Sequence, residues 1–152
     1  MQFSNRITGQ NDLDKTFLRL PASTRRKALM PALRAGATVI RNRASENVKQ
    51  ITSDEASGLL AKSLRVYTLR KYKGYYRVAV MVKKGAVNPR KKDKNGPVRI
   101  GLYGSVLEYG KKGQRPRSWI RKAIKEGKSD AFNAVSRESG LRMASAVMDA
   151  RK

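Results

Sequence analysis

The longest amphipathic pattern of the chain lies in its first third. After the N-cap candidates Ser23 and Thr24, apolar residues recur every three or four positions, which predicts one long helix with a continuous apolar stripe. The stripe comprises Leu29, Leu33, Ala37, Ile40, Ala44, Val48 and Ile51. Pro31 removes one helical hydrogen bond and crowds the preceding turn, so we expect a kink or a restart there.

Two weaker patterns precede that helix. Residues 3–7 predict a short strand that ends at the turn residues Thr8 and Gly9. Leu13, Phe17 and Leu20 then recur at spacings of four and three, which predicts a short helix that stops at Pro21.

The middle of the chain changes from helical spacing to alternation. Residues 57–59 (SGL) are expected to form a break. The following residues 60–69 (LAKSLRVYTL) are expected to begin as a helical turn and to become a strand near Leu64. Residues 75–82 (YYRVAVMV) are rich in β-branched and aromatic residues and give the strongest strand prediction. One face of that strand carries Tyr76, Val78, Val80 and Val82, and residues 71–74 are expected to form the hairpin turn.

Two basic segments interrupt the later pattern. Residues 83–97 combine many basic and turn-forming residues with almost no apolar ones, which predicts a mobile loop. That loop is either a solubilising insertion or an arm that contacts phosphates. Residues 98–109 predict a strand with a break near Gly104, and a second basic loop follows at 111–117.

The last third is expected to be helical. Ser118 is the N-cap candidate of a helix with Trp119 and Ala123 on one side. Gly127 is expected to interrupt it, and helical spacing resumes through Gly140. The chain is therefore predicted to be an α+β single domain over residues 1–152. In it, a long N-terminal helix and a C-terminal helix pack on a small, mainly antiparallel sheet with long basic loops.

The net charge is the most unusual feature of the sequence. The 152 residues include 35 Lys and Arg against 11 Asp and Glu, a net charge of +24, which favours a strongly anionic partner. Basic residues crowd the polar face of the long helix, which is either a solvated face or a binding surface. They are Arg25, Arg26, Lys27, Arg34, Arg41 and Arg43.

Several classes of function lack their chemistry in this chain. It has no His and no Cys, which excludes the usual forms of structural zinc, disulfide scaffolds, thiol nucleophiles and His-based triads. The acids are scattered, and no Walker or dinucleotide signature is present. We therefore expect no enzyme, and no catalytic, cofactor-binding or metal-ligating residues. Without a membrane-span or signal-peptide pattern, we expect the protein in a reducing cytoplasm.

Two single residues draw attention. Glu108 is an isolated acid between Leu107 and Tyr109, so it is either a partner for a specific Arg in an apolar neighbourhood or an outward-facing strand residue. Trp119, the single Trp, follows a basic loop and opens a helix, which suits a core anchor or an interface anchor. Core packing is the favoured interpretation.

Three blocks of sequence stand in a recognisable order. ITG at 7–9 leads through LP at 20–21 into the long helix, and SGLLAKSLRV spans 57–66. YGSVLEYG at 103–110 is then followed by Pro116, Trp119, Ile120, Arg121 and Ala123. In this order the blocks resemble the neck or tail-completion proteins of long-tailed bacteriophages, of the minor tail protein Z type. Lys111 stands where that family has Thr, and Arg117 and Ser118 are additional residues.

The resemblance implies a structural virion protein in the head–tail connector, assembled as a homo-oligomeric ring, expected to be a hexamer, around the DNA passage. Other neck and tail proteins, such as the connector or stopper and the tail terminator or tube, would be its partners. It would act in the virion neck after assembly in the host cytoplasm, without a membrane. A tail-tube terminator and a sequence-nonspecific nucleic-acid-binding protein are the alternatives.

The resemblance also directs attention to surface residues. It implies a partner interface at Glu108, Tyr109, Trp119 and Arg121. The two basic loops are the segments able to reach a neighbouring protein or genomic double-stranded DNA, where contact would be with phosphates and nonspecific in sequence. The candidate residues for that contact are Lys83, Lys84, Arg90, Lys91, Lys92, Lys94, Lys111, Lys112, Arg115 and Arg117.

Overall fold

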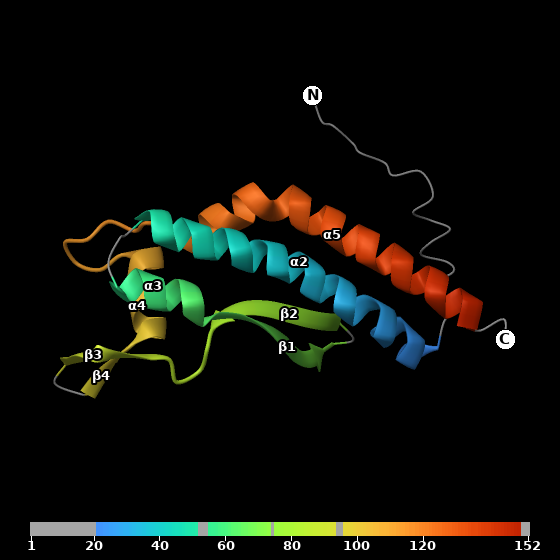
Figure 1. Cartoon of the computed structure of the whole chain (residues 1–152), viewed down its shortest axis with the longest axis horizontal. Coiled ribbons are helices and arrows are strands. Elements are labelled where there is room, and N and C mark those ends of the chain that lie inside the picture. The colour runs from blue at the N-terminus through green and yellow to red at the C-terminus, as the bar shows by residue number, and fades with distance from the viewer. Residues whose placement is uncertain (1–20, 52–54, 74, 94–95, 150–152) are drawn as a thin grey trace, which may run out of the picture.

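A computed structural model describes residues 21–51, 55–73, 75–93 and 96–149 (Figure 1). The strand predicted at 3–7 and the short helix predicted before Pro21 lie outside these residues. Within the described ranges, no helix has the length and apolar character needed to cross a membrane.

The predicted α+β architecture is confirmed. Helix α2 (Ala22–Ile51) and helix α5 (Trp119–Asp149) run antiparallel and pack along each other. The hairpin of β1 (Leu64–Tyr72) and β2 (Tyr75–Val82) packs on α2 from the other side, so α2 lies between α5 and this sheet (Figure 1). The antiparallel strands are divided between two separate two-stranded sheets.

Helix α2 fully buries Ala44 and Val48 of the predicted apolar stripe. The stripe residues nearer its start, Leu29, Leu33, Ala37 and Ile40, are only half-buried, and the buried residues there are Ala28, Ala32 and Gly36, one position earlier. The helix is continuous through Pro31, so of the kink or restart expected there, the restart is wrong. Pro31 removes a single hydrogen bond from a helix of 30 residues, and packing against both α5 and the β1–β2 hairpin outweighs that loss.

Glycines set the close approach of the two long helices. A Cβ atom added at Gly36 of α2 would lie 2.5 Å from Cγ2 of Val135 and 2.9 Å from the carbonyl oxygen of Ala131 on α5. A Cβ at Gly127 would lie 3.1 Å from Cδ1 of Ile40. Helix α5 runs uninterrupted through Gly127, so the predicted interruption is wrong. The glycine serves helix–helix packing there, and that packing offsets its low helix propensity.

The switch from helix to strand occurs where the sequence predicts it. Helix α3 (Glu55–Ser63) ends directly before β1 begins at Leu64. The helix runs through residues 57–59, so the break expected there is wrong. Strand β2 covers the predicted residues 75–82, and its register pairs Leu64 with Val82 and Val66 with Val80. Its half-buried positions include the predicted face of Tyr76, Val78, Val80 and Val82.

Two predictions for the next segment are wrong. Strands β3 (Val87–Asp93) and β4 (Gly96–Arg99) form a hairpin across the segment expected to be a loop. The strand expected at 98–109 is instead helix α4 (Ile100–Tyr109) after the short β4. Its buried residues, Ile100, Gly104, Leu107 and Glu108, have the i, i+4, i+7, i+8 spacing of one helix face. Gly104 lies there because a Cβ would be 3.1 Å from Cδ1 of Leu60.

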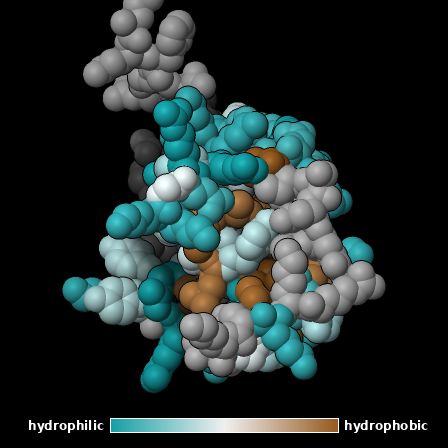
Figure 2. All heavy atoms as spheres, turned by 90° about the vertical axis from the view of Figure 1, so that its left-hand side faces the viewer, coloured by the Kyte–Doolittle hydropathy of each residue, from teal (hydrophilic) through white to brown (hydrophobic). Residues whose placement is uncertain are grey.

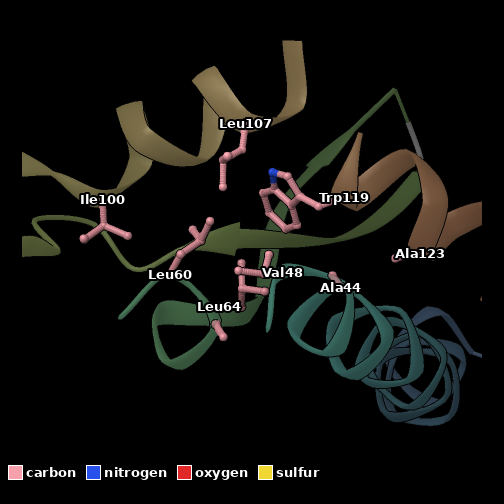
Figure 3. Close-up of a cluster of buried hydrophobic side chains, with 9 residues drawn as sticks. Ala44, Val48, Leu60, Leu64, Ile100, Leu107, Trp119 and Ala123 are labelled. Atoms are coloured by element: carbon pink, nitrogen blue, oxygen red, sulfur yellow. The ribbon is translucent and has the colours of Figure 1, made fainter. Parts of the chain in front are cut away.

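The main core lies where the short and long elements meet. Side chains from α2, α3, β1, α4 and α5 point toward one another in Figure 3. The buried cluster comprises Ala44, Val48, Leu60, Ala61, Leu64, Ile100, Leu107, Trp119 and Ala123. This core fixes α4 against the first turn of α5 and so positions Glu108 and Trp119.

Candidate functional site

Glu108 joins the end of α4 to the start of α5. Its residue is 2% exposed, and its carboxylate accepts hydrogen bonds from the backbone amides of Ile120 (2.9 Å) and Arg121 (3.3 Å). Nε of Arg121 donates a third bond at 2.7 Å, and its Nη2 donates to the Glu108 carbonyl oxygen at 2.9 Å. The carboxylate therefore caps the free amides at the helix N-terminus and forms an ion pair as well.

This geometry decides between the two interpretations of Glu108. The predicted pairing with a specific Arg is confirmed, and the outward-facing strand position is wrong. The strand interpretation failed because residues 100–109 are helical, which turns the side chain inward instead of toward solvent.

Trp119 is part of the core, as the sequence favoured. Its indole Nε1 donates to the carbonyl oxygen of Gly104 at 2.9 Å, and Nδ2 of Asn47 donates to the Trp119 carbonyl oxygen at 3.2 Å. These bonds satisfy the buried polar atoms at the junction of α2, α4 and α5. Of the four predicted interface residues, Tyr109 and Arg121 remain exposed, with the guanidinium 5.5 Å from the ring centroid.

The loop at 111–117 is tied to the helices beside it. Gly110 has φ +79°, and a Cβ there would lie 2.6 Å from the Gln114 carbonyl oxygen, so only glycine fits. Lys111 and Gln114 exchange backbone hydrogen bonds, and the Arg117 amide donates to the Leu107 carbonyl oxygen at 2.8 Å. The predicted phosphate-binding residues of this loop all lie at the surface. They are Lys111, Lys112, Arg115 and Arg117.

Basic charge gathers on one side of the molecule. The described residues of the segment 62–102, which we call the sheet side, lie across α2 from α5 (Figure 1), and the segment contains one acid, Asp93. Their thirteen basic residues are Lys62, Arg65, Arg70, Lys71, Lys73, Arg77, Lys83, Lys84, Arg90, Lys91, Lys92, Lys94 and Arg99. Among the side chains that the structure describes, none of these forms an ion pair with a carboxylate.

The acids whose side chains the structure describes are all on helices, and each contacts a Lys or Arg. Arg43 pairs with Glu46 at 3.9 Å and with Asp130 at 3.5 Å. The other contacts are Glu126 with Lys122 at 3.9 Å, Glu138 with Arg142 at 2.9 Å, and Glu108 with Arg121 at 2.7 Å. The net charge is therefore distributed unevenly: residues 62–102 have a net charge of +12 (thirteen basic residues and one acid), α2 has +6 (seven and one) and α5 has +2 (six and four).

Five of the six predicted phosphate-binding residues of the first basic segment belong to the described part of the sheet side. Lys83 and Lys84 connect β2 to β3, the backbone of Arg90, Lys91 and Lys92 is in β3, and Lys94 lies outside the described residues. A groove of about 670 Å³ runs beside Lys83 and Lys84.

The other side of this groove is formed by residues that sequence reasoning missed, Arg99 and Leu102. Only the hairpin and the start of α4 bring them beside Lys83, so no local pattern reveals them. Figure 2 shows the end of the molecule that carries the β3–β4 hairpin and α4, where hydrophobic side chains appear within a mainly hydrophilic face.

The tip of the β1–β2 hairpin was also missed. Tyr72 and Tyr75 are exposed there, and the guanidinium of Arg77 lies 5.0 Å from the Tyr72 ring centroid. Arg77 also donates to the Arg70 carbonyl oxygen at 2.9 Å. The tip therefore adds aromatic surface and fixed positive charge to the sheet side.

Comparison with known protein families, with curated proteins and with solved structures finds no match for this chain. The groups on the sheet side are ammonium and guanidinium ions, which bind phosphate and carboxylate oxygens. Within the described residues, His, Cys, Asp and Glu form no cluster of three or more that could hold a metal ion. The chemistry that the arrangement supports is therefore the binding of a polyanion.

Proposed function

We propose that this chain is a structural virion protein of a long-tailed bacteriophage, forming part of the head–tail connector ring that joins tail to capsid around the DNA passage. The observation that carries the proposal is the uneven charge: thirteen basic residues and one acid on the sheet side, with no described ion pair to a carboxylate. A surface of this kind favours the backbone of a duplex, which carries one charge per roughly 1.7 Å.

The packing of residues 103–123 supports the same proposal. This block carries the strongest part of the resemblance to neck proteins. Its helices α4 and α5 are joined by hydrogen bonds from Trp119 to Gly104 and from Ile120 and Arg121 to Glu108. The junction holds α4, the loop at 111–117 and the start of α5 in a fixed relation. The exposed Tyr109 and the basic loop are thereby presented from a rigid base, as contact with a neighbouring protein requires.

In this role, the positive charge acts through counterion release. Lys and Arg that neutralise phosphates release condensed cations, which gives affinity without sequence preference. Such contact suits a ring through which any part of a genome passes. No reaction is required of the protein, in agreement with its expected lack of catalytic residues.

Negative-stain imaging of particles made without the protein tests this proposal. A connector protein predicts filled heads and complete tails that remain separate. Tails of abnormal length would instead indicate a tail-tube terminator. Normally joined particles would contradict both virion roles and leave a free-standing nucleic-acid-binding protein.

A further inference from the structure

A second surface of the molecule differs in character from the sheet side. A groove of about 660 Å³ runs between α2 and α5, with apolar walls formed by Ala37 and Ile40 on one helix and Phe132 and Val135 on the other. Phe132 is 54% exposed although it is a large aromatic residue. Exposed apolar surface beside a groove is typical of protein–protein contact.

The charge of α5 is nearly balanced, unlike that of α2 and of the sheet side. Helix α5 contains six Lys and Arg and four Asp and Glu, α2 contains seven and one, and the sheet side contains thirteen and one. The groove itself is flanked by charges of both signs, because Lys125, Glu126 and Lys128 all line it and are exposed. Two molecules of +24 charge therefore repel each other least when they approach through their α5 faces.

We infer that the α2–α5 groove is a docking surface for a second copy of this chain, with Phe132 as its central anchor. A copy supplies what the groove lacks: an aromatic side chain to fill it, and groups of both signs to meet Lys125, Lys128 and Glu126. The contact can thus be self-complementary, which pairs two copies about a two-fold axis. A two-fold contact does not by itself close a ring, so this inference goes beyond the proposed function and adds a pairing of copies to it.

Other occupants fit the groove less well. A nucleic acid or a strongly acidic protein is attracted more strongly to the sheet side, because the described basic groups there have no carboxylate partners. Phosphates also offer nothing apolar to cover Phe132, Ile40 and Val135. The two surfaces of the molecule therefore suit two kinds of partner, a polyanion on the sheet side and another copy on the α5 side.

Salt should affect the binding of another copy and the binding of a polyanion in opposite directions. Raising the salt from about 0.1 M to about 1 M shortens the Debye length from about 10 Å to about 3 Å, which weakens repulsion between like-charged copies. Apolar docking should therefore strengthen over this range. Binding of duplex DNA should weaken over the same range.

The test is sedimentation velocity on the full chain at both salt concentrations, comparing wild type with Phe132→Ser and with the control Met81→Ser. Met81 is 43% exposed on β2, which packs on α2 from the side away from α5, so the control removes an exposed apolar side chain away from the groove. We expect salt-promoted association of wild type and Met81→Ser, and an association constant about tenfold or more lower for Phe132→Ser.

A second variant covers the case in which Phe132→Ser fails to fold. Ser129→Arg adds bulk and charge at an exposed position in the groove and should reduce association to a similar extent. A wild type that stays monomeric at both salt concentrations would overturn the inference, as would undiminished association of both groove variants. Particles made without the protein test the connector role separately, so failure of the docking surface is distinguishable from failure of the proposed function.

Discussion

Replacing Glu108 by Gln tests the buried junction between α4 and α5. The carboxylate accepts three hydrogen bonds, at 2.9 Å and 3.3 Å from backbone amides and at 2.7 Å from Nε of Arg121. Gln keeps one acceptor oxygen but turns an NH₂ group toward donors, so either the Ile120 amide, or both the amide and Nε of Arg121, lose their acceptor. In both cases the guanidinium loses its charged partner. The helix N-terminus also loses its compensating negative charge.

The size of the effect follows from burial. Hydrogen bonds to a charged group contribute about 1.5–3 kcal/mol each, and breaking a buried ion pair costs about 3–5 kcal/mol. The Arg121 side chain is 58% exposed, so water can solvate the guanidinium again after the change. We therefore expect Glu108→Gln to lower the free energy of unfolding by about 2–4 kcal/mol, below the cost of breaking a pair with both partners buried.

Urea unfolding followed by the fluorescence of Trp119, the single Trp and a neighbour of the junction, measures this loss. Glu138→Gln is the matched control, because Glu138 pairs with Arg142 at 2.9 Å on the surface of one helix. The control should change stability by about 0.5 kcal/mol or less. Equal losses for the two variants would refute the view that Glu108 holds the junction together.

Other changes test the packing and the charge. Trp119→Ala should cost about 3–5 kcal/mol in the same urea assay; a variant that unfolds like wild type would contradict the core position. Gly36→Ala should lower the melting temperature because its Cβ would meet Val135, whereas Gly140→Ala, with open space around it, should raise stability by about 0.5–1 kcal/mol. Light scattering at low salt should find mainly monomers or small oligomers, because the charge of +24 opposes assembly without partners; a stable ring there would count against this. Changing Arg90, Lys91, Lys92 and Lys94 together to Gln should make the salt dependence of duplex binding shallower by up to about 3.6 units. An unchanged slope, with infectious particles still completed, would assign that segment to solubility.

Elements with a strong period were predictable from the sequence. The apolar stripe of α2, the switch near Leu64 and the strand β2 each depend on local spacing over many residues. The strand prediction for residues 98–109 was wrong because a short apolar run fits either a strand or a buried helix. The packing of Gly104 against Leu60, which is a tertiary contact, favours the helix. The interruption predicted at Gly127 was wrong for a similar reason, because the contact of Gly127 with Ile40 is tertiary and is not visible in the local sequence.

The candidate site was predictable only in part. The scarcity of acids singled out Glu108, and pairing with an Arg, which the structure shows, was one of the two interpretations that its isolation left open. The cap on α5 could not be predicted, because it depends on α4 ending beside Ile120. The gathering of basic residues on one side, and the apolar groove between α2 and α5, likewise appear only when the layers are assembled.

In vitro joining tests the connector role most directly. Extracts of cells infected with phage that lack the protein supply filled heads and separate tails, and the purified chain is then added. The proposed function predicts that joined, infectious particles form only after the addition, as counted by plaque assay and imaging. Heads and tails that join equally well without the chain, or that stay separate after its addition, would contradict the proposed function.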